Sequence, residues 1–138
     1  MVVDSVASIE YCFNKWYKLR DIMNGRVRLP SEGCYVYAFR LDRRFGRLRG
    51  ESDILYFGCT KKCQGLNQRI KENYLEGKGG RTTQRIHRYL FEYGYLEHVE
   101  IAWIRVGSEE EAKVKESEFL KLYEEQHHEL PPWNRQGG

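Results

Sequence analysis

The chain has 138 residues and a net charge of +3, and it is rich in aromatic residues, with ten Tyr, six Phe and three Trp. This length suits one domain with a single core, and the mild basic excess permits an anionic partner without requiring one. No stretch approaches the ~20 apolar residues of a membrane span, and the polar, acidic N-terminus is unlike a signal peptide. We therefore expect a cytoplasmic protein that has no membrane partner.

The four cysteines, Cys12, Cys34, Cys59 and Cys63, are expected to be reduced, because disulfides are rare in cytosolic proteins. Cys59 and Cys63 resemble half of a zinc site, but no second Cys/His pair follows at zinc-like spacing. The simplest interpretation is that the thiols are small buried hydrophobic side chains. Cys34 and Cys59 could also face each other across a hairpin.

The first half of the chain predicts a helix and then two paired strands. Apolar residues recur at helical spacing over 5–23, and a stretch with two Gly and one Pro follows, so 1–32 is predicted to be a helical extension with a connector. Residues 34–41 and 53–60 are rich in β-branched and aromatic side chains and predict strands. The polar, basic stretch 42–52 predicts a hairpin loop and hence an antiparallel pair.

The second half predicts three helices and one strand. Ser108 and Glu111 form a capping box at the start of the last helix, and Pro131 and Pro132 end it. The order of elements predicts an α+β domain, with a small three-stranded, mostly antiparallel sheet flanked by helices. The predicted elements are helices over 64–77, 82–94 and 108–129 and a strand over 98–106.

One acidic side chain lies on the apolar face of the last predicted helix. Glu116 shares that face with Ala112, Phe119 and Tyr123 at spacings of three and four residues. A carboxylate in this position must be paired, protonated or bound to a metal ion. Arg69, in the first helix after the two strands, could neutralise it in a structural ion pair, or could instead bind a phosphate group.

Two tripeptides and three later residues occur in an order that resembles the GIY-YIG nuclease domain. The matching residues are, in chain order, GCY at 33–35, YFG at 56–58, Arg69, Glu116 and Asn134. One tripeptide would be weak evidence, but the ordered set with its spacing is specific. The resemblance implies a GIY-YIG-like nuclease domain over 33–138, in which Asn134 would form a hydrogen bond that fixes a tyrosine or a water molecule.

The resemblance implies a divalent-metal-dependent endonuclease that hydrolyses phosphodiester bonds of nucleic acid, with DNA as the expected substrate. Glu116 would hold one Mg²⁺ or Mn²⁺ ion, and Arg69 would bind the phosphate with help from Lys61. Tyr35 would deprotonate the attacking water while Tyr56 positions it, although either phenol could be the base. A phenol has an ordinary pKa near 10, so this role requires nearby cations that lower the pKa.

Basic side chains flank the motifs and are candidate contacts for phosphate groups. As a set they suit binding to a nucleic-acid backbone better than readout of bases. The candidate contacts are Arg43, Arg44, Arg47, Arg49, Arg81, Arg85, His87 and Arg88. The expected partner is double-stranded DNA, bound by a monomer or a homodimer. Two alternatives stay open: a catalytically inactive nucleic-acid-binding or protein-interaction domain on the same scaffold, and a structural domain in which Glu116 and Arg69 merely pair.

Overall fold

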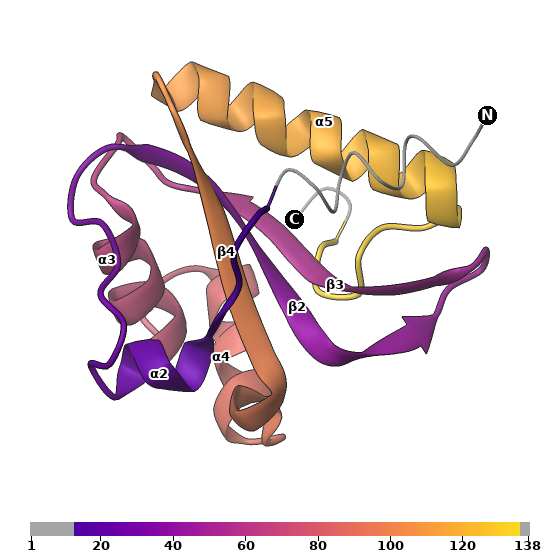
Figure 1. The fold of residues 1–138 in the computed structure, drawn as a ribbon, viewed down its shortest axis with the longest axis horizontal. Helices are drawn as coiled ribbons and strands as arrows, with labels where there is room; N and C mark the ends of the chain where they lie inside the picture. Colours follow the sequence, from indigo (N-terminus) through magenta and orange to yellow (C-terminus); the bar gives the residue numbers. More distant parts are fainter. Residues whose placement is uncertain (1–12, 136–138) are drawn as a thin grey trace.

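The computed structural model describes residues 13–135 and has an α+β fold built on a four-stranded antiparallel sheet in the order β1-β4-β2-β3 (Figure 1). The strands are β1 (Tyr17–Lys18), β2 (Cys34–Gly46), β3 (Glu51–Cys59) and β4 (Val99–Val106). The helices are α2 (Leu19–Met23), α3 (Leu66–Gln68), α4 (Arg81–Phe91) and α5 (Glu109–His127). A π-helical segment (Arg69–Leu75) continues α3, and a 3-10 turn (Tyr95–His98) precedes β4. The predicted fold class is confirmed. Within residues 13–135, no helix has the length and apolar character needed to cross a membrane.

The N-terminal part of the sheet differs from the sequence prediction. Of the helix predicted over 5–23, only Leu19–Met23 is helical, and residues 5–12 lie outside the described part of the chain. Tyr17 and Lys18 instead form a fourth strand, which pairs with β4, and the Tyr17 ring stacks on Trp103 at 5.2 Å. The prediction of three strands is therefore wrong, because pairing at the open edge of β4 outweighs the helical spacing of the apolar residues.

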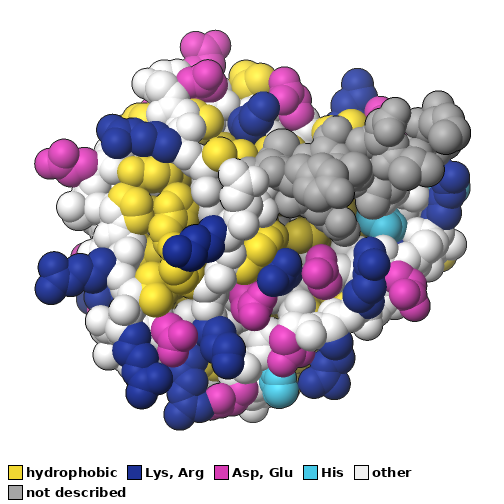
Figure 2. Space-filling view, viewed as in Figure 1, with side chains coloured by type: hydrophobic (Ala, Val, Ile, Leu, Met, Phe, Trp, Pro, Cys, Tyr) yellow, Lys and Arg dark blue, Asp and Glu magenta, His cyan; other side chains and the backbone are white. Residues whose placement is uncertain are grey.

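The side chains of β2 alternate between two hydrophobic clusters, one on each face of the sheet. Tyr37 and Phe39 face the layer that holds α2, α3 and α4, whereas Val36 and Ala38 face α5 (Figure 1). β4 also contributes to both clusters, so it is covered on both faces. β3 forms one edge of the sheet. On the face shown in Figure 2, basic and acidic side chains are interspersed, so neither sign of charge dominates there.

The start of α5 is capped as the sequence predicted. The side chain of Ser108 accepts a hydrogen bond from the Glu111 N–H at 3.1 Å. The Glu111 carboxylate accepts a hydrogen bond from the N–H of Gly107 rather than from that of Ser108. The helix therefore begins where the capping box places it, which fixes the rotation of α5 and the face on which Glu116 lies.

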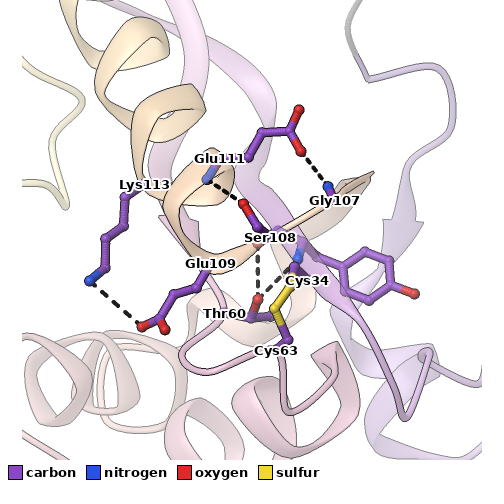
Figure 3. Close-up of a disulfide and its surroundings, with 9 residues drawn as sticks. Cys34, Thr60, Cys63, Gly107, Ser108, Glu109, Glu111 and Lys113 are labelled. Atoms are coloured by element: carbon purple, nitrogen blue, oxygen red, sulfur yellow. Dashed lines mark hydrogen bonds and ion pairs between the residues drawn. A yellow bond between two sulfur atoms is a disulfide. The ribbon is translucent and has the colours of Figure 1, made fainter.

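Cys34 and Cys63 form a disulfide, with their Cα atoms 4.2 Å apart (Figure 3). The expectation of reduced thiols is wrong for this pair. Cys59 is not the partner of Cys34, because it is a free cysteine, and Cys12 lies outside the described residues. The cysteines thus give no support to a cytoplasmic location, which stays a prediction.

The loop after β3 brings Cys63 next to Cys34. Its backbone is left-handed at Lys62 and Cys63, with φ of 51° and 50°, and Gln64 forms a bridge with Gly33 at the start of β2. The disulfide therefore fastens the Lys61-containing loop to the first motif. Sequence spacing alone does not reveal such a return of the chain.

Loss of this disulfide is expected to destabilise the fold by about 3–4 kcal/mol, because the two cysteines are 29 residues apart and close a loop of that size. Urea unfolding with and without a reductant measures the effect. The double variant Cys34→Ala/Cys63→Ala is the control, and its stability should not respond to the reductant. A thiol assay that finds Cys34 and Cys63 free in the native, air-equilibrated protein would contradict this account.

Candidate active site

A pocket of about 700 Å³ lies where β3, the π-helical segment, α4, α5 and the C-terminal segment meet. Five of the six predicted catalytic residues line it: Tyr56, Lys61, Arg69, Glu116 and Asn134. Arg81 and Arg85, predicted to contact phosphate, line the same pocket. Residues separated by up to 78 positions in the sequence are thus brought together around one opening.

Tyr35 does not line this pocket. Its side chain is 4% exposed, and its ring lies under the Arg105 guanidinium at 6.0 Å. Its backbone is fixed to Thr60, whose N–H donates to the Tyr35 carbonyl at 3.0 Å. The structure therefore gives no support to Tyr35 as the base.

Tyr37, two residues further along β2, contacts Arg69 through its hydroxyl, although it is fully buried and does not line the pocket. It lies opposite Gly58, the glycine of the second motif, and a Cβ on Gly58 would come within 2.6 Å of the Tyr37 ring. Gly58 is thus needed to make room for this phenol. The alternation of β2 places Tyr35 and Tyr37 on one face, so strand periodicity was the signal that could have identified Tyr37.

Three phenols surround the Arg69 guanidinium. Its Nε donates to the Tyr37 hydroxyl and its Nη2 to the Tyr74 hydroxyl, both at 3.1 Å. The hydroxyls of Tyr37 and Tyr74 are 2.6 Å apart, and Tyr74 donates to Tyr56 at 3.4 Å. Among the described residues, Arg69 Nη1 has no hydrogen-bond partner, so this end of the guanidinium is available to a ligand in the pocket.

Tyr56 ends this chain of hydroxyls. Its oxygen accepts from Tyr74, which leaves its own O–H free to donate into the pocket. Burial and the neighbouring Tyr74 raise the pKa of Tyr56, and the opposing effect of Arg69 is smaller. The cation-lowered pKa that a phenolate base requires is therefore not found here. The neutral hydroxyl suits positioning of a water molecule or a phosphate oxygen.

Glu116 forms no ion pair with any described residue. Arg69 bonds the phenols through Nε and Nη2 and is not paired with Glu116, so the alternative of a structural Glu116–Arg69 ion pair is not supported. Burial raises the pKa of Glu116, and a hydrogen bond with Cys59 and the charge of Arg69 only partly oppose the rise. Burial and the adjacent Glu116 raise the pKa of the Cys59 thiol to about 12, so Cys59 is protonated at neutral pH.

This environment suits a divalent cation at Glu116. A half-buried carboxylate without an ion pair, at the wall of a water-accessible pocket, gains from a bound cation. Mg²⁺ is commonly held by one or two carboxylates while it keeps several water molecules. Glu116 is the one carboxylate among the described residues that line the pocket, and the described residues contain no group of three or more His, Cys, Asp or Glu side chains suited to a metal ion.

Asn134 binds the edge of β3 rather than a tyrosine. Its Oδ1 accepts from the Phe57 N–H and its Nδ2 donates to the Phe57 carbonyl, both at 3.0 Å. The N–H of Trp133 also donates to the Leu55 carbonyl at 2.9 Å. The C-terminal segment thus pairs with the outer edge of the sheet, and it holds the strand that carries Tyr56.

Replacement of Asn134 by alanine is expected to destabilise the fold by about 1–2 kcal/mol, because it leaves the Phe57 N–H and carbonyl without partners. Urea unfolding followed by circular dichroism measures the loss. Arg135→Ala, at the exposed neighbouring residue, should leave stability unchanged. An Asn134→Ala variant as stable as the wild type would show that the paired amide does not contribute to the fold.

The other candidate nucleic-acid contacts lie away from the pocket. Arg43 pairs with Asp42, and Arg88 with Glu92. His87 is held by the Tyr74 carbonyl through Nδ1 at 2.9 Å and packs on Phe91. These side chains do not line the pocket.

The basic residues of the β2–β3 hairpin face the far end of α5. Arg47 is 12% exposed, pairs with Glu129 at 3.3 Å and donates to the Leu130 carbonyl, so it stabilises the fold. The backbone of Arg49 is bound to His127. Arg44 lies on the same hairpin. The pocket and this hairpin are therefore separate basic regions.

Comparison of the chain with family models, with curated proteins and with solved structures gives no match. The geometry of the pocket is thus the basis for assigning a function.

Proposed function

We propose that this chain is a divalent-metal-dependent endonuclease that hydrolyses phosphodiester bonds of nucleic acid, with DNA as the substrate. The observation that carries the proposal is the convergence of Tyr56, Arg69 and Glu116 on one pocket. Each of these three side chains keeps an unused polar group there. The choice of DNA over RNA rests on the resemblance to GIY-YIG nucleases.

Arg69 would bind the phosphate that is attacked. Its guanidinium is oriented by two phenols, and Nη1 is left for a phosphate oxygen. Lys61 lines the same pocket on a loop that the disulfide fastens, and its charge would add to that of Arg69. Fixed cations aimed at the negative charge that develops at phosphorus lower the barrier without reorganisation during the reaction.

Glu116 would hold the cation. A bound Mg²⁺ or Mn²⁺ would neutralise phosphate charge and lower the pKa of a water molecule. Tyr56 would donate a hydrogen bond from its neutral hydroxyl and so orient the water or the phosphate. This role replaces the phenolate base inferred from the sequence, because burial raises the pKa of Tyr56.

Supercoiled plasmid tests the proposal. Nicking by the wild type in Mg²⁺ or Mn²⁺, abolished by a chelator and restored by added metal, is the expected result. Intact plasmid together with salt-sensitive retention of the protein on DNA would favour the catalytically inactive binding domain. A protein that neither cuts nor binds DNA under these conditions would favour the alternative of a structural domain.

A further inference from the structure

The N-terminal turn of α4 opens on one wall of the pocket. The residues of this turn that line the pocket are Gly80, Arg81, Thr82, Thr83 and Arg85. α4 is 11 residues long, and no side chain caps its first amides. Gln84 is the first residue whose N–H bonds back along the helix, to the Gly80 carbonyl at 3.0 Å. Free amides and the positive end of the helix dipole therefore border the cavity.

Thr83 is a second and independent sign of a ligand. Its side chain is 5% exposed and lines the pocket, yet its hydroxyl has no hydrogen-bond partner among residues 13–135. The Thr83 hydroxyl is therefore open to the pocket, where it can donate to a bound oxyanion.

Arg85 points to the same chemistry. Its Nη2 donates to the Trp133 carbonyl at 2.6 Å, which fixes the guanidinium, while its buried Nε has no partner. Arg81, exposed at the start of the helix, adds a second positive charge. The space around Gly80 is empty, because a Cβ built there would have no neighbouring atom within 4 Å. Its φ of −77° is a conformation that any residue can adopt.

We propose that this turn is a phosphate-binding subsite, distinct from the phosphate position at Arg69. Amide N–H groups, the Thr83 hydroxyl and two arginines together match the oxygens of one phosphate group. The assignment of this phosphate to the nucleic-acid strand that is cut rests on the proposed function. The binding of a phosphate oxyanion at this turn does not depend on the proposed function.

Amide chemical shifts in a titration with inorganic phosphate test the subsite, with sodium chloride at equal ionic strength as the reference. Saturable shifts at 80–83 that chloride does not reproduce are expected. Thr83→Val should weaken phosphate binding at least about threefold without lowering stability, because the lost hydroxyl has no partner in the protein. Shifts spread over all basic residues, or an affinity unchanged in Thr83→Val, would overturn the proposal.

Two arginines of the same helix provide a matched pair. Arg81 and Arg88 are both exposed, but only Arg81 lines the pocket. Arg81→Ala should weaken phosphate binding severalfold more than Arg88→Ala. Equal effects of the two variants would show that only overall charge matters and would refute a subsite.

A short oligothymidylate, added in the presence of a chelator, distinguishes the source of the phosphate. Tighter binding than inorganic phosphate, with shifts at the same amides, would identify a strand phosphate. Shifts with inorganic phosphate alone would refute that assignment. Phosphate binding at 80–83 without any DNA cleavage would support the subsite and refute the nuclease function. DNA cleavage without shifts at 80–83 would support the nuclease function and refute the subsite.

Discussion

Replacement of Glu116 by glutamine is expected to lower the rate of plasmid nicking about a thousandfold, because it removes the carboxylate that would hold the cation. The same change should not lower the free energy of unfolding, since no described residue forms an ion pair with Glu116. Nicking rates and urea unfolding in the presence of a chelator measure the two effects. Glu118→Gln is the matched control, on an exposed position of the same helix, and should change neither.

The pH dependence of stability gives a second test of Glu116. Burial raises the pKa of Glu116 above its ordinary value of 4.5, so between these two pKa values the folded protein binds more protons than the unfolded chain. The stability contributed by this carboxyl is therefore present below pH 4.5 and is lost as the pH rises through the folded-state pKa. Relative to the wild type, Glu116→Gln should gain stability as the pH rises above 4.5. A loss of several kcal/mol would instead show that Glu116 neutralises a buried charge.

Replacement of Arg69 by alanine is expected to reduce nicking by about two to three orders of magnitude and to destabilise the fold by about 2–4 kcal/mol. The stability loss arises because the buried hydroxyls of Tyr37 and Tyr74 each lose a donor. Arg69→Lys keeps the charge but cannot donate to both phenols and to a phosphate, so it should restore little activity. Single-turnover cleavage and urea unfolding measure these effects.

Tyr37→Phe separates the two roles of Arg69. It removes the hydrogen bonds of the Tyr37 hydroxyl with Arg69 and Tyr74 but keeps the guanidinium charge, so it should cost about 1–2 kcal/mol of stability and lower cleavage far less than Arg69→Ala. If both variants lost cleavage to the same extent, the arginine would act only by holding the phenols in place, and its proposed contact with phosphate would be refuted.

Local patterns in the sequence predicted much of the fold. The β-branched and aromatic composition of 34–41 and the Ser108 cap each depend on neighbouring residues, and β2 and α5 begin at or next to the predicted positions. The predicted hairpin loop over 42–52 is wrong over most of its length, because β2 continues to Gly46 and β3 begins at Glu51. β1 was missed because a two-residue strand has no periodicity of its own. It exists only because β4 offers an edge with which it can pair.

The site was predicted less completely, because its parts depend on contacts between distant segments. The ordered motifs identified Tyr56, Arg69 and Glu116, which do meet at the pocket. Tyr37 and Tyr74 were missed, since their roles follow from the pairing of β2 with β3 and from the π-helical turn beside them. Asn134 meets the edge of β3 only after the chain returns from α5, so its bonds to Phe57 had no local signal.

The central claim is that Glu116 holds a cation beside a phosphate bound by Arg69. Anomalous scattering from Mn²⁺, in crystals grown with a short uncleavable DNA duplex, tests it most directly. A manganese peak at the Glu116 carboxylate, with a DNA phosphate on Arg69, is the result that we predict. A pocket without manganese, in which Glu116 turns onto Arg69 and the DNA binds elsewhere, would contradict it.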